Sequence, residues 1–181
     1  QYLAAKETSK HIVDMIQAGW YVVIGHRNGP QVGFILQKAE LAEKEIGLAM
    51  APLDVCGAQS QGQIGYMLAQ NLQNELKKRG IDKPVACVVE QTVVDKNDPA
   101  FQNPSKPIGG FMTEAEAKAK AKSEGWTVIE DAGRGWRRVV PSPIPQEIVE
   151  LEAIKTLIDA GVVTISVGGG GIPVIRNDKG E

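Results

Sequence analysis

The sequence predicts an α/β fold in which a mostly parallel β-sheet lies between helices. Three short segments are apolar almost throughout rather than alternating, as strands buried on both faces are. Helical patterns separate them, which is typical of β-α-β units and a parallel sheet. The predicted strands lie in residues 20–24 (WYVVI), 84–94 (PVACVVEQTVV) and 162–167 (VVTISV).

Helical periodicity and end signals define the segments between these strands. Gly19 and Gly161 end two of the helices, and Pro145 lies near the start of the last one. The long central helix finishes with the basic run 77–79 (KKR), where positive charge suits the negative end of the helix dipole. The predicted helices span residues 3–18, 31–47, 54–80, 113–125 and 145–161.

Residues 95–143 break the alternation of strands and helices. This stretch contains five prolines and a single clear helical pattern, TEAEAKAKAKSEG. Thr113 and Glu116 within it have the spacing of a capping box. A stretch this long that is not a β-α unit is typical of an inserted subdomain. We therefore expect one domain, residues 1–181, with a lid segment inserted at about residues 95–143.

Composition excludes several classes of protein. Hydrophobic residues make up 43% and charged residues 23% of 181 residues, which is ordinary for a soluble globular domain. The net charge of −2 argues against a nucleic-acid partner, and no apolar run approaches the roughly 20 residues of a membrane span. Cys56 and Cys87 lie far apart without a C-x-x-C pattern, so we expect no metal site and a reducing, cytoplasmic location.

Two glycine-rich stretches follow predicted strands, at residues 25–33 (GHRNGPQVG) and 168–171 (GGGG). Ligands of parallel sheets bind at the carboxyl ends of the strands, where both stretches lie. Neither has the spacing of a P-loop or of a dinucleotide fingerprint. Taken alone, each is compatible with a plain turn or a close-packed crossing. Successive glycines also leave backbone N–H groups free to converge on an anion, and finding two such loops at one edge favours that interpretation.

Four stretches in this order resemble the carbamate kinases, a branch of the amino acid kinase fold. The resemblance covers essentially all 181 residues and implies a three-layer α/β sandwich. The stretches are residues 28–33 (NGPQVG), 97–109 (NDPAFQNPSKPIG), 130–150 (EDAGRGWRRVVPSPIPQEIVE) and 168–174 (GGGGIPV).

The resemblance implies reversible phosphoryl transfer, in which carbamoyl phosphate and ADP give ATP and carbamate with Mg²⁺ as cofactor. It also implies a cytoplasmic homodimer that acts in arginine metabolism. Catalysis of such transfers is mainly positioning and charge neutralisation. The positions that match the substrate-binding residues of the family are Asn28, Gly29, Pro30, Gly168, Gly169, Gly170 and Gly171, and Lys106 matches its catalytic lysine.

Two departures from the family pattern affect this expectation. Arg27 replaces a glycine, so the loop would be strained if this position needs a positive φ. The family also has an N-terminal strand with a Gly-Gly-Asn loop and a C-terminal nucleotide-binding half, and neither occurs between Gln1 and Glu181. We therefore expect the phosphoacceptor half, inactive alone. The alternative is a non-catalytic module that binds a small anion or only dimerises.

Three arginines and a histidine near these motifs have simpler structural interpretations. Arg134, Arg137 and Arg138 are expected to pair with the neighbouring carboxylates at positions 130 and 131 rather than to contact substrate. His26 is expected to help hold the first glycine loop, and no general base is needed because a carbamate oxygen is already anionic.

Overall fold

The computed structural model describes all 181 residues and divides into two compact units. The first unit contains Gln1–Asn28, Gly57–Thr92 and Ile148–Ile172. The second unit contains Gly29–Cys56, Val93–Glu147 and Pro173–Glu181. The whole predicted lid segment lies within this unit, and its role as a lid stays a prediction.

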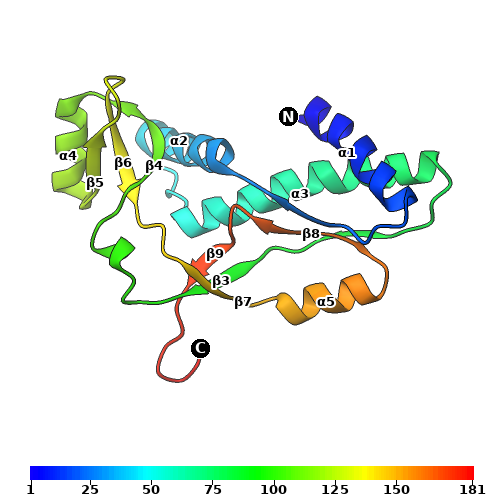
Figure 1. Cartoon of the computed structure of the whole chain (residues 1–181). Helices are drawn as coiled ribbons and strands as arrows, with labels where there is room; N and C mark the ends of the chain where they lie inside the picture. Colours follow the sequence, from blue (N-terminus) through cyan, green and yellow to red (C-terminus); the bar gives the residue numbers. More distant parts are fainter. The chain divides into compact units, whose positions relative to one another are not determined.

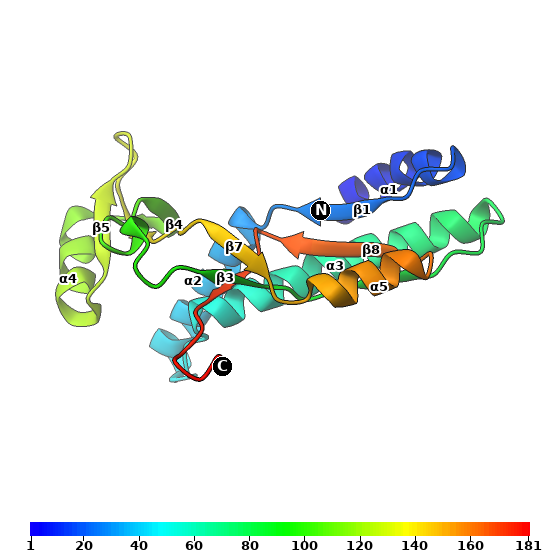
Figure 2. The same ribbon diagram turned by 60° about the horizontal axis from the view of Figure 1, so that its bottom comes forward.

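A three-stranded parallel sheet forms the centre of the first unit. Its order is β1 (Val23–His26), β8 (Val163–Gly168) and β2 (Val85–Cys87), and β8 pairs with both neighbours in parallel. Figure 2 shows β8 running beside β1. Ile24 lies opposite Ile165, so the strand register brings apolar side chains together at the middle of the sheet.

Helices cover the sheet of the first unit on both sides. β8 lies between α1 (Tyr2–Gln17) and α5 (Leu151–Asp159) (Figure 1). Most of α3 (Leu53–Lys78) belongs to this unit and shares one apolar core with α1, β1 and β8. The buried core residues are Val13, Ile16, Ile24, Ile64, Leu68, Leu72, Leu76, Val163 and Ile165.

β8 shows why this sequence forms a central strand. Val163, Thr164, Ile165 and Ser166 are all buried in succession, so both faces of the strand are covered. This confirms the prediction of a parallel sheet enclosed by helices, because strands that are covered on both faces have apolar or small residues at successive positions rather than at alternate ones.

The second unit combines one long helix with an antiparallel sheet. The sheet has the order β4-β6-β5, and Lys106 at its start lies opposite Val140. A small core of Leu36, Cys56 and Ile108 joins the helix to the sheet. The elements are α2 (Gly29–Ile46), the 3-10 helix η1 (Pro99–Phe101), β4 (Lys106–Met112), α4 (Glu114–Glu124), β5 (Thr127–Glu130) and β6 (Trp136–Val140).

The capping box of α4 is confirmed. The Thr113 hydroxyl accepts a hydrogen bond from the Glu116 N–H, and the Glu116 carboxylate accepts one from the Thr113 N–H at 2.8 Å. Gly125 ends the helix in the left-handed conformation. Both ends of this helix therefore follow from local sequence alone.

Three strands lie where the chain passes from one unit to the other. They are β3 (Gln91–Val94), β7 (Pro145–Ile148) and β9 (Ile172–Val174). Across the whole structure, no helix combines the length and the apolar character that crossing a membrane requires.

Several predicted element boundaries were wrong. Residues 84–94 form two strands, β2 and β3, because the chain breaks at the buried Glu90. Trp20 and Tyr21 precede β1 and are 66% and 80% exposed, so the predicted strand starts too early. The antiparallel strands of the lid segment were not predicted at all.

The last helix is also shorter than its sequence pattern indicates. Pro145 begins β7 rather than a helix, and α5 starts only at Leu151. The Glu150 carboxylate accepts hydrogen bonds from the backbone N–H of Gln91 at 2.7 Å and from its side-chain amide at 2.9 Å. These bonds hold the residues before α5 against β3, which overrides their helical spacing.

Leu72 provides a test of the core of the first unit. It is fully buried on α3, so we expect Leu72→Ala to lower the free energy of unfolding by about 2–5 kcal/mol through lost burial and a residual cavity. Urea unfolding monitored by circular dichroism measures this change. Leu3→Ala is the matched control, because Leu3 is 78% exposed on α1 and its removal is expected to cost little. Equal losses in both variants would contradict this core.

Candidate functional site

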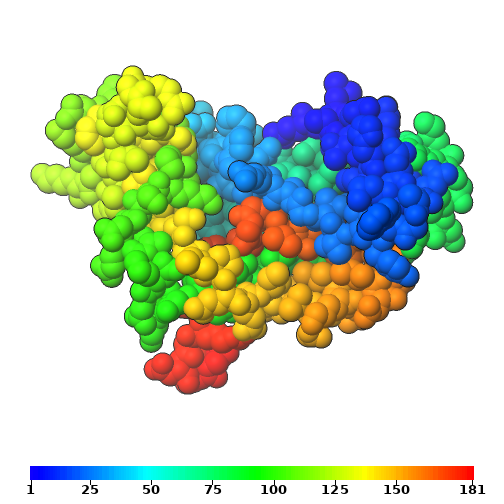
Figure 3. Space-filling model, in the orientation of Figure 1, coloured from blue at the N-terminus to red at the C-terminus, as the bar shows by residue number.

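The two glycine-rich stretches meet at the carboxyl edge of the parallel sheet. The Gly169 N–H donates to the His26 carbonyl at 2.8 Å, and His26 lies opposite Gly168 in the strand register. The end of β8 and the turn that follows it, in orange-red, reach the molecular surface (Figure 3). The structure therefore brings both predicted loops to one accessible edge.

The turn after β8 requires glycine for two separate reasons. Gly169, Gly170 and Gly171 have φ values of +68°, +89° and +82°, a left-handed run that side chains disfavour. The side-chain amide of Asn28 also lies against Gly169, and the hydroxyl of Thr92 against Gly171, so a Cβ atom at either position would collide. Both the backbone conformation and the close approach of neighbours exclude other residues here.

Hydrogen bonds orient the peptide groups of this turn. The Gln61 side-chain amide donates to the Gly168 carbonyl at 3.1 Å, and the Thr92 hydroxyl donates to the Gly170 carbonyl at 3.0 Å. Both carbonyls are thus occupied by the protein, whereas the Gly170 N–H has no partner within the first unit. A turn of successive backbone N–H groups forms a concave anion site, and here the Gly170 N–H is the free donor.

Gln61 connects this turn to the break between β2 and β3. Its side chain is 1% exposed, accepts a hydrogen bond from the Glu90 N–H at 2.8 Å and donates to the Glu90 carbonyl at 3.2 Å. Together with its bond to Gly168, the amide uses its acceptor and both donor directions inside the protein. This one side chain therefore sets the spacing between two chain segments beneath the turn.

Asn28 is positioned by a second short chain of hydrogen bonds. Its amide nitrogen donates to the Ser60 hydroxyl at 2.8 Å, and that hydroxyl donates to the Gly57 carbonyl at 2.6 Å. Ser60 is fully buried. The arrangement fixes the Asn28 side chain between α3 and Gly169.

Glu90 is a fully buried carboxyl group directly beneath the turn. Its Oε2 accepts a hydrogen bond from the Val167 N–H at 2.6 Å, while its Oε1 has no partner. Burial raises the pKa of Glu90 and the charge of Glu150 acts in the same direction, against a smaller lowering by the Val167 N–H. The carboxyl group is therefore biased towards its neutral form.

Val167 is strained at the point where Glu90 holds it. Its φ is +54°, a left-handed conformation that is unusual for a β-branched residue and costs about 1–3 kcal/mol. The hydrogen bond to Glu90 helps to fix this conformation, which turns the chain from β8 into the glycine run. Such strain beside a ligand-accessible turn is typical of a functional site.

Sequence reasoning missed the four residues that support the turn. Their signal was present as polar residues inside otherwise apolar segments, within SQGQIGYML on α3 and VVEQTVV at the break between β2 and β3. In a buried segment such residues need partners, so they mark a hydrogen-bonded network. The residues are Ser60, Gln61, Glu90 and Thr92.

The first glycine loop differs from expectation at its centre. Arg27 does not have a positive φ, so the condition for strain at this position is not met, and the arginine lies exposed on the surface. The His26 ring lies against Gly168, and its Nδ1 is 3.2 Å from the Arg27 carbonyl oxygen, so it contributes to the loop as expected.

The remaining predicted site residues belong to the second unit. Gly29 and Pro30 are the first two residues of α2, where proline is favoured because its missing N–H has no partner to lose. The first turn of α2 has no acidic residue to offset the helix dipole. Lys106 is the exposed first residue of β4 and forms no ion pair within its unit. The structure thus joins Asn28 to Gly168–Gly171 in the first unit.

Asp98 ties together the two chain connections that lead into and out of the lid segment. Its carboxylate accepts hydrogen bonds from the Ala100 N–H at 2.8 Å and from the Ile144 N–H at 2.9 Å. Both bonds lower the pKa of Asp98, and the bond from the Ile144 N–H has the larger effect on it. Lys106 lies on the stretch that this carboxylate anchors.

The arginines of the lid segment only partly follow the prediction. Arg134 and Arg137 both pair with Asp131, at 2.9 Å and 3.2 Å, as expected. Arg138 does not pair with a carboxylate of its unit and instead lies over the Trp126 ring, 4.5 Å from its centroid. The Glu130 carboxylate caps the backbone N–H of Gly133 rather than an arginine.

The buried carboxyl of Glu90 generates a pH prediction. The folded-state pKa of Glu90 lies above the ordinary value of about 4.3 that the unfolded chain has. At pH values between these two pKa values, Glu90 therefore carries more bound proton in the folded protein than in the unfolded chain. The free energy of unfolding of the wild-type protein should therefore fall as pH rises through this window and level off above it. Glu90→Gln, which cannot ionise, should lack this decline.

Urea unfolding from pH 4 to pH 8 measures the difference between the two proteins. Glu152→Gln is the control, since its side chain is 85% exposed on α5 and should leave the wild-type pH profile unchanged. Parallel profiles for wild type and Glu90→Gln would contradict a carboxyl group that burial keeps neutral.

No protein-family model matches the sequence. Curated relatives do match, over 177 residues and 97% of the chain each. They include the carbamate kinase of Thermococcus kodakarensis, at 58% identity over 56% of its length, and a carbamate kinase-like protein of Escherichia coli, at 58% identity over 57% of its length.

Solved structures give the same result. A carbamate kinase from Giardia lamblia bound to AMP-PNP is 46% identical, with a TM-score of 0.91 over 99% of this chain and 56% of that protein. A protein from Aeropyrum pernix K1 is 37% identical, with a TM-score of 0.93 over 100% of this chain and 57% of that protein. The chain spans a little more than half the length of these relatives. By sequence and by fold, the chain is homologous over nearly its whole length to carbamate kinases, and it has the amino acid kinase fold across the part of them that it spans.

Proposed function

We propose that this chain carries the phosphoacceptor part of a carbamate kinase, which transfers a phosphoryl group between carbamoyl phosphate and ADP to give ATP and carbamate. The observation that supports this function best is the glycine turn after β8. The Gly168 and Gly170 carbonyls are bound by Gln61 and Thr92, and the Gly170 N–H is left available to an anion.

Substrate binding is assigned to both glycine-rich stretches. Gly168, Gly169, Gly170 and Gly171 would hold phosphoryl or carbamate oxygens through their backbone, with the free N–H of Gly170 as the clearest donor. Asn28 would contribute its side chain, which Ser60 orients. Gly29 and Pro30 would add the positive end of the α2 dipole, which favours an anion and carries no acidic residue to compete.

Catalysis is assigned to Lys106. An exposed lysine that has no ion pair within its unit is free to approach the oxygens of the transferring group and to neutralise the charge that spreads over them. The carbamate oxygen needs no general base, because it is already ionised. The work of the protein is then to position the reactants and to compensate their charge.

Cofactors and partners follow from the same homology. We propose that ADP or ATP is the second substrate and that Mg²⁺ accompanies it. Neither unit gathers three or more histidine, cysteine, aspartate or glutamate side chains into a cluster that could hold a metal ion. Mg²⁺ that accompanies a nucleotide is usually held by the substrate phosphates with one or two carboxylates. A cytoplasmic homodimer acting in arginine metabolism remains part of this proposal.

A second candidate function is binding of a small anion without catalysis. It is favoured because the network beneath the glycine turn is complete within the first unit. Anion binding and phosphoryl transfer are therefore tested separately.

Lys106→Ala tests the catalytic assignment. We expect it to lower the rate of ATP formation from carbamoyl phosphate, ADP and Mg²⁺ by about 100-fold or more, the scale for removing one charge-stabilising group from a transition state. Lys96→Ala, which removes an exposed lysine nearby in the chain, should leave the rate unchanged. Equal rates for wild type and Lys106→Ala would remove Lys106 from the mechanism, and no activity in either protein would favour the anion-binding module.

Asn28→Ala tests the anion site without requiring turnover. Losing the Asn28 amide removes one polar group and loosens the packing against Gly169, so the affinity for inorganic phosphate should fall about tenfold. Isothermal titration calorimetry measures this affinity. Gln73→Ala, at an exposed position on α3, provides the control. Phosphate binding that is unaffected by Asn28→Ala would contradict a site at the glycine turn.

A further inference from the structure

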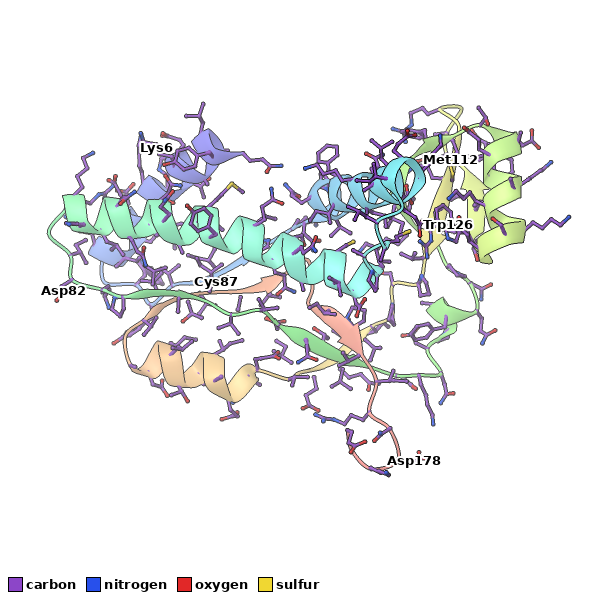
Figure 4. All side chains as sticks on the ribbon, turned by 180° about the vertical axis from the view of Figure 1, so that it is seen from behind. Lys6, Asp82, Cys87, Met112, Trp126 and Asp178 are labelled. Atoms are coloured by element: carbon purple, nitrogen blue, oxygen red, sulfur yellow. The ribbon has the colours of Figure 1, made fainter.

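A cavity of about 170 Å³ lies in the second unit, and none of the residues assigned to phosphoryl transfer lines it. It is enclosed by α2 on one side and by the sheet of the lid segment on the other. Figure 4 shows Met112 and Trp126 between α2 and α4. The lining residues are Leu36, Gln37, Glu40, Ile108, Gly109, Gly110, Phe111, Met112, Trp126 and Arg138.

Two charged side chains of opposite sign line this cavity without pairing. Glu40 comes from α2 and Arg138 from β6, and both are partly buried. Neither takes part in a hydrogen bond or an ion pair within the second unit, although both face the same space. Burial raises the pKa of Glu40 and lowers the pKa of Arg138. Each charge has therefore lost water without gaining a direct partner, which is costly.

Other charged groups of the lid segment are bound to one another. Arg134 and Arg137 share Asp131, and Lys120 pairs with Glu124 at 2.6 Å. These pairs leave Glu40 and Arg138 without a direct ion pair. Because their charged groups lie beyond ion-pair distance across a cavity, there is space for a molecule between them.

Apart from Gln37 and the two glycines, the remaining side chains of the cavity wall are apolar. Leu36 and Ile108 belong to the core of the unit, and Met112 and Trp126 extend the same surface. Arg138 is held over the Trp126 ring, which fixes the direction of its guanidinium group. A ligand that fits has one negative group, one positive group and an apolar body between or beside them.

We propose that this cavity binds a free α-amino acid with an apolar side chain. Its carboxylate would meet Arg138, which favours planar bidentate recognition, its ammonium group would meet Glu40, and its side chain would lie against the apolar wall. A dicarboxylate would leave Glu40 uncompensated and a diamine would leave Arg138 uncompensated. The cavity is also smaller than the usual range for nucleotide-sized ligands.

Occupation of this cavity would connect α2 to β6 through the ligand. The amino acid would then bias how firmly the sheet that begins with Lys106 is held to α2. This inference is independent of phosphoryl transfer, because it depends on binding at residues that have no part in the proposed reaction.

Calorimetric titration of the chain with L-leucine, L-valine and L-methionine tests the proposal. We expect binding of one molecule per chain, with the affinity lowered about tenfold or more by Glu40→Gln and by Arg138→Gln, since each removes a hydrogen bond to a charged group. Glu114→Gln should have no effect, because Glu114 is paired with Lys118 on α4 and does not line the cavity. Circular dichroism verifies that each variant is folded.

A second test uses ligand analogues and the wild-type protein only. Its outcome therefore does not depend on whether the substituted proteins fold. 4-Methylpentanoate lacks the ammonium group and 3-methylbutylamine lacks the carboxylate, and each should bind about tenfold or more weakly than L-leucine. No binding of any of the three amino acids at about 10 mM would overturn the proposal. Binding that persists in both Glu40→Gln and Arg138→Gln, or binding of either analogue as tight as that of L-leucine, would overturn it as well.

Discussion

The architecture of the site depends on the hydrogen bonds of one buried amide. Gln61 joins the Gly168 carbonyl to the backbone N–H and carbonyl of Glu90. The end of β8 and the break between β2 and β3 are therefore held by one side chain that is almost completely buried. A buried amide that uses every donor and acceptor specifies distances that apolar packing alone leaves adjustable. The parallel sheet brings the strand ends near each other, and Gln61 determines how they are held.

The shape of the glycine turn follows from this constraint. Gln61 and Thr92 bind the Gly168 and Gly170 carbonyls, and these bonds fix the peptide planes so that the Gly170 N–H stays without a partner in the first unit. Val167 accepts an unfavourable conformation at the start of the turn, and the surrounding network holds it there. Stability is thus exchanged for a backbone surface that presents donors, as is usual where a protein binds an anion.

The sequence predicted the parts of the fold that local chemistry determines. The helix pattern of α1, the capping box at Thr113 and the buried strand β8 each follow from short-range rules. It did not predict the break at Glu90 or the late start of α5, because both depend on partners distant in the chain, Gln61 and Gln91. The glycines and Asn28 have a visible sequence pattern and their role in binding stays a prediction, whereas the side chains that support the turn appear in the sequence only as isolated polar residues in apolar runs.

The carboxyl groups of Asp98 and Glu90 respond to acid in opposite directions. The lowered pKa of Asp98 means that the bonds to Ala100 and Ile144 persist well into acidic solution and are lost when pH falls through the folded-state pKa. Over the same descent, protonation favours the buried carboxyl of Glu90 rather than opposing it. Strong acid would therefore release the two connections of the lid segment that Asp98 holds, whereas the network beneath the glycine turn does not depend on a charged Glu90.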